Sequence, residues 1–571
     1  MNKTCKRIIA LTIAFVLAFS LSACSTNQDR LPGTGTKGVV EKIDWSGYDE
    51  LLTESTQEVD PLKRALILHK AEDMLIDTGA IGPITSGKSY MLVKTYITGV
   101  DFANDGNVNL AYIDGGNTNS IGVNLCSEVT KLDPVANTTF DISQIAQNTY
   151  ARLLKKDADG NILPDIAESY TVSDDGLVYE FTLRDGLKWS DGSEFDAEDF
   201  VYSWKRAAAS SNAFEYGNMY DCISGYPDNL DVKASGDGKV LTVRLSNPTM
   251  YFPQLCCHTS YSPVQRKQVE EAPGYKDASG NIINPSAWAA EGPVVSNGPF
   301  VVNEWKHNEK IVLKKNPYYY DADKVKTESI IMMLTTDSAS AYSAYLSDSI
   351  AVLLDHVPSD ILPTLRNSPE FHLCEKNASS SIMFNVKSPL FAGMTKEEAA
   401  TFRKAIRWTI DSQFMVDVVG SGNRVTCGTY VPQKMSDGTG KRFSETEGYS
   451  YPEEGGYYNP QPDLERARKM LESIGFEFGN DGKLKQPITI EYLYPSNASN
   501  EATAVALQAD LARLGINLSL SSREWAVFLG EESNGNFEMA MTNWNADFDD
   551  PYNFLSLFTT DSPNNRAHLG R

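Results

Sequence analysis

The acidic run Asn543–Pro551 (NWNADFDDP) contains the side chains whose types and spacing best suit ligand chemistry. It holds three carboxylates, Asp547, Asp549 and Asp550, directly after an aromatic strand-like stretch. A carboxylate in a water-poor cleft pairs strongly with an ammonium group through charge-assisted hydrogen bonds. The same residues are also typical of turns and helix caps that precede a proline. From the residues alone, both interpretations remain open.

Two other motifs resemble ligand loops. Gly82–Ser89 (GPITSGKS) satisfies the phosphate-loop pattern, but a true loop follows a strand and opens a helix. Here a helical pattern precedes it and a β-like stretch, residues 89–100, follows, while Pro83 removes one amide donor. This order argues against nucleotide binding.

Asp157–Glu168 (DADGNILPDIAE) has acids at the first, third and last positions of a calcium loop. Ile162 occupies the position that requires glycine, and Pro164 interrupts the loop. We therefore expect a turn between two strands rather than a calcium site.

Metal and covalent catalysis have little support in this sequence. The histidines show no H-E-x-x-H spacing, and neither a C-x-x-C pair nor a G-x-S-x-G elbow occurs. The eight cysteines are Cys5, Cys24, Cys126, Cys222, Cys256, Cys257, Cys374 and Cys427. We expect most of them to be small buried residues. No metal, no cofactor and no enzymatic activity is predicted.

Length and charge indicate two lobes and an acidic surface. A chain of 571 residues with 41% hydrophobic residues can bury two substantial cores. The net charge of −24 excludes the basic face that a nucleic-acid partner needs.

The most informative stretch is Val178–Arg206 (VYEFTLRDGLKWSDGSEFDAEDFVYSWKR). Residues 178–183 alternate in polarity like a half-buried strand, and two Asp-Gly turns bracket a short second strand around Leu187–Trp189. A β-hairpin is therefore predicted. Asp196 with Asp199 then predicts a capped helix.

This stretch resembles the signature region of extracytoplasmic solute-binding proteins that serve peptide ABC importers. The family shows "LR-x-G-x-x-W-x-DG…x-A-x-D-x-x-x-S-x-x-R". The matching residues are Leu183, Arg184, Gly186, Trp189, Asp191, Gly192, Ala197, Asp199, Ser203 and Arg206.

The same resemblance covers the acidic run, which is similar to the family's "W-x-AD-[YF]-x-DP" element. It implies a peptide-binding site that includes Trp544, Ala546, Asp547 and Phe548. In the family the aspartate after alanine holds the free α-amine of a bound peptide, which implies that role for Asp547. Asp550, and largely Asp549, are expected to be turn and cap residues.

The first residues resemble a bacterial lipoprotein leader. Three basic residues precede the apolar run Ile8–Leu21, which is too short for a comfortable membrane span. Leu21-Ser22-Ala23-Cys24 then resembles a lipobox. We expect residues 1–23 to be a signal peptide, Cys24 to carry the lipid, and residues 24–39 to be a flexible tether. The alternative is an ordinary secretory cleavage site.

The order of segments differs from the family's usual order. Residues 40–91, with two helical patterns (Tyr48, Leu51 and Leu52; then Leu62, Ala65, Leu66, His69 and Met74), resemble the family's carboxy-terminal end. Residues 121–150 resemble its usual mature start. A circular permutation, with residues 105–119 as the connection, explains both observations. The alternatives are a truncated or rearranged gene and an unrelated helical prefix.

Together these features predict an α/β, two-lobed periplasmic-binding-protein-like fold (type II, cluster C-like) with a hinge. Lobe I would comprise residues 92–390, with the family start near 121, and lobe II residues 391–571 together with 40–91. The resemblance implies a monomeric, lipid-anchored receptor on the outer face of the cell membrane. It would close on an oligopeptide and deliver it to the permease subunits of an ABC importer.

Alternatives within the same class are binding proteins for a dipeptide, an oligosaccharide, a nickel chelate or haem. From another class, the alternatives are an extracellular hydrolase or a nucleotide-binding protein.

Overall fold

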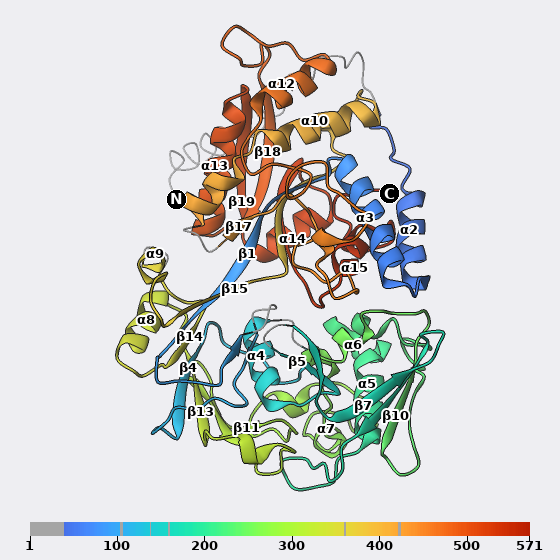
Figure 1. The fold of residues 1–571 in the computed structure, drawn as a ribbon, viewed down its shortest axis with the longest axis vertical. Helices are drawn as coiled ribbons and strands as arrows, with labels where there is room; N and C mark the ends of the chain where they lie inside the picture. Colours follow the sequence, from blue (N-terminus) through green and yellow to red (C-terminus); the bar gives the residue numbers. More distant parts are fainter. Residues whose placement is uncertain (1–38, 103–106, 137–138, 158–159, 359–360, 421–423) are drawn as a thin grey trace, which may run out of the picture.

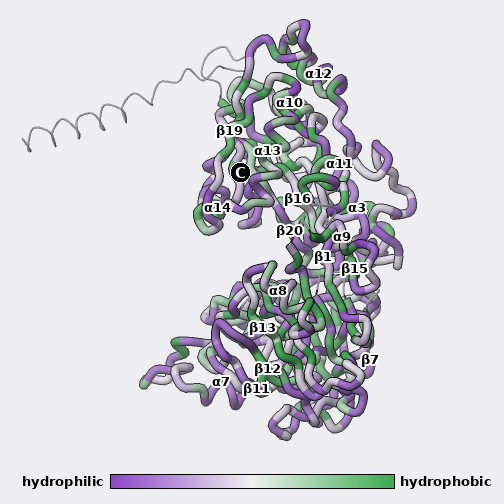
Figure 2. The backbone as a smooth tube through the Cα atoms, turned by 90° about the vertical axis from the view of Figure 1, so that its left-hand side faces the viewer, coloured by the Kyte–Doolittle hydropathy of each residue, from purple (hydrophilic) through white to green (hydrophobic). Residues whose placement is uncertain are grey.

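The computed structural model describes residues 39–102, 107–136, 139–157, 160–358, 361–420 and 424–571. The leader and the predicted lipidation site Cys24 lie outside these residues. Two lobes stack along the long axis of the molecule and meet at a narrow waist (Figures 1 and 2). The α/β class and the two lobes predicted from the sequence are confirmed.

One mixed sheet runs through both lobes. Its strands are, in order across the sheet, β11 (Phe300–Lys306), β12 (Lys310–Lys315), β13 (Ser329–Leu334), β4 (Ser120–Leu125), β14 (Val352–Leu354), β1 (Ile81–Val93), β16 (Ala378–Phe384), β20 (Met539–Asn545), β18 (Ile488–Pro495) and β19 (Ile516–Arg523). Two further strands, β15 (Phe371–Glu375) and β17 (Arg424–Thr426), also pair with β1.

Strand β1 belongs to both lobes at once, and Figure 1 shows it crossing the waist. Residues 81–87 pair with β16 and β17 in lobe II, and residues 88–93 pair with β15 and β14 in lobe I. The strand predicted at residues 89–100 therefore begins earlier and ends earlier than expected. Because Gly82–Ser89 is extended and paired, its amides cannot cradle a phosphate.

Lobe I contains a second, four-stranded sheet in the order β7 (Ala167–Val172), β8 (Val178–Leu183), β10 (Val240–Arg244) and β9 (Val232–Ala234). The alternating polarity of residues 178–183 does form a strand, but the predicted hairpin partner at Leu187–Trp189 is wrong. Those residues form a loop whose only ladder contact is a single bridge from Lys188 to Glu194, and β8 pairs with β7 and β10 instead. The Asp-Gly turns in the sequence did not indicate that β8 pairs with strands further away in the chain.

The predicted cap of helix α5 (Ala197–Ala208) is confirmed. Asp196 accepts from the helix amides, and the Asp199 side chain accepts from the Asp196 N–H, which completes the capping box. Its buried face packs Phe200 and Trp204 into an aromatic cluster with Phe252 and Tyr261.

The remaining elements are short in lobe I and longer in lobe II. Lobe I holds β2 (Asp101–Phe102) paired with β3 (Val108–Asn109), β5 (Leu154–Lys156) paired with β6 (Ile162–Pro164), and α4 (Phe140–Thr149), α6 (Phe252–Leu255), α7 (Arg266–Glu270), α8 (Ser338–Leu346) and α9 (Leu362–Leu365). Lobe II holds α2 (Ser46–Gln57), α3 (Pro61–Asp77), α10 (Lys396–Trp408), α11 (Ser412–Phe414), α12 (Leu464–Ser473), α13 (Ala498–Ala512), α14 (Trp525–Ser533) and α15 (Tyr552–Leu555). Single 3₁₀ turns are η1 (Ser210–Asn212), η2 (Glu215–Tyr220), η3 (Thr259–Tyr261), η4 (Ala287–Ala289), η5 (Ala322–Lys324), η6 (Pro389–Phe391), η8 (Phe443–Glu445) and η9 (Ser556–Phe558), and η7 (Met415–Val419) is a π turn.

One local prediction agrees with these bounds. The β5–β6 pair places Asp157 in a turn, where its carboxylate accepts from the Asn161 N–H at 2.8 Å. This is the strand-connecting turn expected in place of a calcium site. In lobe II, β18 and β19 are parallel and are connected by α13.

Two large cores divide the chain. Apolar residues from Met91 to Leu354 form the core of lobe I, and apolar residues from Trp45 to Ile84 and from Ile382 to Leu569 form the core of lobe II. Strand β16, which precedes the boundary predicted at residue 390, packs in the second core.

Residues 40–80 pack mainly on lobe II and beside the chain's last residues (Figure 1), and Arg64 also lies over the ring of Tyr251 in lobe I. Trp45 Nε1 donates to the Phe558 carbonyl at 2.8 Å, and the Thr560 N–H donates to Asp49 at 2.9 Å. The buried face of α3 differs from the predicted one. Leu62, Leu66 and Met74 are only half-buried, whereas Arg64 and Glu72 are buried. A hydrophobic pattern cannot identify a polar residue that the fold buries with a partner.

Candidate functional site

Asp547 lies in the loop between β20 and α15, at the waist between the lobes. Its carboxylate accepts from the Asn553 side chain of its own lobe and from the Tyr216 hydroxyl of lobe I, both at 3.4 Å. The loop is held by Asn553, whose Oδ1 also accepts from Trp544 Nε1 at 2.9 Å. The sequence folds this way because β20 ends where the acidic run begins and Pro551 starts the next helical turn.

An aromatic stack joins the same loop to lobe I. The rings of Phe548 and Tyr251 are parallel with centroids 4.4 Å apart, and Tyr552 lies 5.6 Å from Tyr251. Tyr251 belongs to the core of lobe I, so this loop contacts both lobes. Such stacked pairs add about 0.5–1.5 kcal/mol beyond the burial of their area.

Asp547 carries its charge without a cation. Among the residues that the structure describes, no lysine, arginine or histidine lies within ion-pair distance of its carboxylate. Burial raises the pKa of Asp547 to about 6, and the hydrogen bonds from Asn553 and Tyr216 limit that rise. A cation entering the site would supply the missing partner.

The two following aspartates have structural roles, as expected. Asp549 accepts from the Asn377 side chain at 2.8 Å and from the Ser436 N–H at 3.1 Å. Asp550 caps the next turn through the Tyr552 N–H at 2.9 Å and forms a buried, two-point ion pair with Arg64 of α3 at 2.7 and 2.9 Å.

A cavity lies beside Asp547, and its wall comes from four separate parts of the chain. It encloses about 490 Å³, open solvent included. The lining residues are Asp101, Asn107, Asn109, Gln147, Arg152, Lys156, Asp157, Gln254, Cys257, His258 and Asp547. All except Asp547 come from lobe I, so the acidic loop forms the lobe II side of this cavity.

The four residues that the sequence grouped have different environments. Asp547 lines the cavity, and Phe548 stacks on lobe I. Trp544 and Ala546 pack against the core of lobe II, and the Ala546 N–H extends the β20 ladder by donating to the Asn377 carbonyl at 2.8 Å.

Sequence reasoning did not find Tyr216, Tyr251, Arg64 or Arg152. Tyr216 and Arg64 lie 331 and 486 positions from the aspartates that they contact. Of these four residues, only Arg64 could have been suspected from the sequence, because it is an arginine on an otherwise apolar helical face.

The described residues contain no group of histidine, cysteine and acidic side chains that could hold a metal ion. Burial raises the pKa of the Cys126, Cys256 and Cys427 thiols, which disfavours nucleophilic thiolates at these positions. In the described part of the chain, no helix combines the length and apolar character that crossing a bilayer requires.

Comparison with known proteins places this geometry in context. Residues 161–566 match the family described as "Bacterial extracellular solute-binding proteins, family 5 Middle". The chain is 29% identical over 460 residues to the oligopeptide-binding protein OppA of Bacillus subtilis, covering 78% of each protein. It is 28% identical over 460 residues to the periplasmic oligopeptide-binding protein OppA of Salmonella typhimurium, covering 77% of each.

Solved structures share the fold. The peptide-bound OppA of Listeria monocytogenes is 25% identical, with a TM-score of 0.58, over 79% of this chain and 86% of that chain. The unliganded, open form of the murein tripeptide-binding protein MppA is 21% identical with the same TM-score, over 80% of this chain and 84% of that one. The two-lobed architecture is therefore that of periplasmic binding proteins.

Proposed function

Because the chain belongs to the bacterial extracellular solute-binding proteins of family 5, we propose that it binds oligopeptides between its lobes and delivers them to an ABC importer. The names of the relatives support this substrate class, since OppA proteins of two bacteria are described as oligopeptide-binding. The site supports it chemically, because a cavity between the lobes carries a carboxylate that has no cation within ion-pair distance among the described residues.

The observation that carries the proposal is the setting of Asp547. Its carboxylate is ionisable near neutral pH, faces a cavity and contacts lobe I only through the neutral hydroxyl of Tyr216. A peptide α-ammonium placed there forms charge-assisted hydrogen bonds in a site largely shielded from water. A ligand without a free amine leaves the carboxylate unpaired and is rejected.

Binding then couples to the arrangement of the lobes. Asp547 and Phe548 of lobe II meet Tyr216 and Tyr251 of lobe I, so a ligand held at Asp547 bridges the two lobes. A ligand that contacts both lobes favours the closed arrangement by its differential affinity for that state. The closed shape is what the permease subunits would recognise.

Native mass spectrometry of the soluble part of the chain, purified without denaturation, tests the substrate class. A ladder of retained masses that matches short peptides is the expected result. A single defined mass would instead indicate one specialised solute, such as a sugar or a chelate.

Calorimetric titration tests the role of Asp547. We expect Asp547→Asn to weaken binding of free-amine peptides by roughly tenfold or more, and N-acetylation of the peptide to do the same to the wild type. Asp549→Asn is the matched control, because the hydrogen bonds of Asp549 go to Asn377 and Ser436 and its side chain does not line the cavity. Equal affinity of the wild type and Asp547→Asn would refute the assignment.

We further propose that Cys24 is lipidated and tethers the protein to the outer face of the cell membrane. The lipobox-like Leu21-Ser22-Ala23-Cys24 supports this. Cys24→Ser is expected to move the protein from the membrane fraction to the soluble fraction. Unchanged membrane association of that variant would contradict the anchor.

The segment order supports a circular permutation of the family's usual arrangement. Residues 40–91 pack on lobe II against residues 555–570, with the Tyr48 hydroxyl donating to the Leu555 carbonyl at 2.7 Å. The family match, by contrast, begins at residue 161. Contact between these two segments is what joining them in the other order requires.

A further inference from the structure

Arg152 is a buried cation on the wall of the cavity beside Asp547. Its side chain is almost fully buried and lines both this cavity and a neighbouring one of about 310 Å³. The guanidinium donates to the Tyr150 carbonyl at 3.2 Å and to the Gln147 side chain at 2.9 Å. Its Nε has no acceptor.

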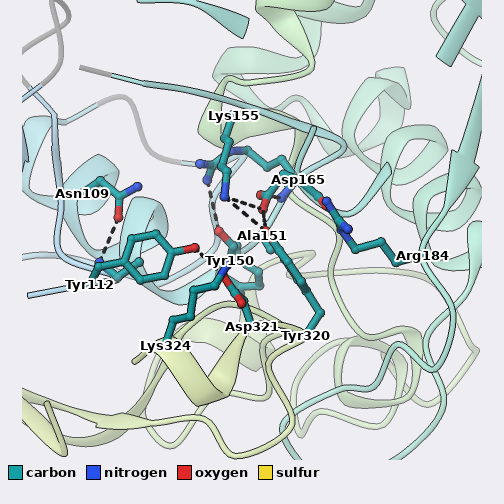
Figure 3. Close-up of polar contacts among 12 residues, drawn as sticks. Asn109, Tyr112, Tyr150, Ala151, Lys155, Asp165, Arg184, Tyr320, Asp321 and Lys324 are labelled. Carbon is teal, nitrogen blue, oxygen red and sulfur yellow. Dashed lines mark hydrogen bonds and ion pairs between the residues drawn. The ribbon is translucent and has the colours of Figure 1, made fainter. Parts of the chain in front are cut away.

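The carboxylate of Asp165 contacts the main chain of Arg152 and already has other partners. Asp165 accepts from the main-chain N–H of Arg152 at 2.9 Å and from the Tyr320 hydroxyl at 2.8 Å, and it lies 3.9 Å from Lys155 Nζ. Figure 3 shows Asp165, Lys155 and Tyr320 converging. Among the described residues, no carboxylate lies within ion-pair distance of the Arg152 guanidinium.

Three other buried arginines provide a contrast. Arg403 and Arg407 of α10 also lack carboxylate partners among the described residues, but the Nε of each donates to a main-chain carbonyl, that of Thr78 or Pro83. Arg206 has an unpaired Nε but forms an ion pair with Asp133, whereas Arg152 combines an unpaired Nε with the lack of an ion-pair partner among the described residues. A guanidinium in this position is suited to a planar anion that accepts two hydrogen bonds.

Among the described residues, the same cavity therefore holds a carboxylate with no cation within ion-pair distance, at Asp547, and a guanidinium with no carboxylate within that distance, at Arg152. Asp101 and Asp157 also line its wall. The other cation on the wall, Lys156, acts on the Asp549 carboxylate, whose pKa it lowers against the rise caused by burial. A ligand that carries both an ammonium and a carboxylate would give Asp547 a cation and Arg152 an anion. A buried charge without a partner costs several kcal/mol. A ligand with only one of the two groups would leave either Asp547 or Arg152 unpaired.

We propose that Arg152 binds a carboxylate of the ligand, so that the receptor selects peptides with an acidic group close to the free amino end. This inference rests on the proposed peptide-binding function and on Asp547 as the amine contact. Two sources present the same chemistry: the terminal carboxylate of a very short peptide, or an aspartate or glutamate side chain near the start of a longer one.

Matched peptide pairs on the wild-type protein test this without any mutation. The first pair is trialanine as the free acid and as the amide. The second is a set of amidated longer peptides with glutamate or glutamine at the first, second or third position. In calorimetric titration, the carboxylate member of at least one pair is expected to bind roughly tenfold or more tightly. The pair that responds identifies the source.

Substitution of Arg152 tests the residue. Arg152→Gln is expected to abolish the difference within the responding pair by weakening only its carboxylate member, and Arg152→Lys to keep part of the difference. Retention of the full difference in Arg152→Gln would overturn the proposal, because another cation would be responsible.

The outcomes distinguish a failure of the role proposed for Arg152 from a failure of the proposed peptide-binding function. If no pair differs on the wild type while Asp547→Asn weakens every peptide, the amine contact stands and the role of Arg152 is refuted. If no peptide binds the wild type, both fail. Because the wild-type comparison needs no variant, misfolding of Arg152→Gln cannot rescue the proposal.

Discussion

At the scale of single residues, the candidate site contains two charged groups, Asp547 and Arg152, that have no ion-pair partner among the described residues. Burial raises the pKa of Asp547 to about 6. A destabilising group of this kind is typical of functional sites, and the proposed ligand would supply its partner. The neighbouring Asp550 shows the contrast, since Arg64 pairs with it inside the fold.

The raised pKa of Asp547 predicts a bell-shaped pH dependence of peptide affinity. Binding requires the ionised carboxylate, so affinity is expected to fall as the pH drops below about 6. It should also fall above about 8, where a peptide α-amine loses its proton. Calorimetric titration between pH 5 and pH 9 measures both limbs. A profile in Asp547→Asn that still falls on the acidic side would contradict this assignment.

The raised pKa of Asp547 also predicts how the stability of the unliganded protein changes with pH. A carboxyl whose pKa is higher in the folded than in the unfolded state keeps its proton longer in the folded state, so stability falls as the pH rises through that interval. Asp547→Asn is therefore expected to raise the melting temperature at pH 7 but to have little effect near pH 4. Thermal melts of the ligand-free protein at both values check this. A variant less stable than the wild type at pH 7 would contradict it.

Residue types in a motif could be predicted from the sequence, whereas their partners could not. The acidic loop, its turn residues and the capped helix α5 were each recognisable, because their interactions are local. Tyr216, Tyr251 and Arg152 come from lobe I, and no periodicity in one segment encodes contacts made across hundreds of residues. The hairpin predicted at Leu187–Trp189 failed for the same reason.

At the scale of elements, α3 connects the N-terminal segment to the binding loop. Arg64 forms the ion pair with Asp550 and also donates to the Ser55 carbonyl of α2 at 3.0 Å. About two turns further along the same helix, Glu72 accepts from the N–H groups of Tyr430 and Val431 at 2.9 and 2.8 Å. The helix therefore positions two separate loops of lobe II.

Breaking the Arg64–Asp550 pair should be costly. Arg64→Met leaves a buried carboxylate without its cation, and we expect it to lower the free energy of unfolding by about 3–5 kcal/mol. Urea denaturation measures the change. Lys63→Met, at an exposed position of the same helix, is the control and is expected to change stability by less than about 0.5 kcal/mol. Equal effects of the two substitutions would show that the ion pair does not stabilise the fold.

Glu72 of the same helix predicts a pH dependence of stability that is independent of the Arg64–Asp550 pair. Burial raises the pKa of Glu72 to about 8, so the folded state retains its proton across neutral pH and loses stability as the pH rises from about 5 to 8. Glu72→Gln keeps an acceptor for both N–H groups and should flatten this slope. Glu72→Ala leaves both donors unpaired and is expected to cost about 2–4 kcal/mol. Denaturation at pH 5 and pH 8 checks both variants, and an unchanged slope in Glu72→Gln would contradict the shift.

At the scale of the whole molecule, the proposed permutation predicts that the order of segments matters less than their contacts. A variant that begins at residue 120, joins residue 571 to residue 41 through a short Gly/Ser linker, and ends at residue 118 restores the family's usual order. Because residue 570 already packs against Trp45, the linker spans a short distance. We expect this variant to fold and to bind the same peptides with a similar affinity.

Removal of the segment is the opposing test. Deletion of residues 40–120 removes α2, α3 and β1, and β1 lies inside the main sheet between β14 and β16. The deleted protein is expected to lose its cooperative unfolding transition. A stable, peptide-binding deletion variant would refute the permutation.

Strand β1 also makes one sheet common to both lobes, and this has a consequence for hydrogen exchange. Its main-chain groups are paired on lobe II at one end and on lobe I at the other, with neighbours along both edges. An amide proton of β1 can therefore reach solvent only when the strand that holds it separates, β16 or β17 in lobe II and β14 or β15 in lobe I. These amides should be among the slowest of the chain to exchange for deuterium, and the two ends of the strand would report the opening of the two lobes separately.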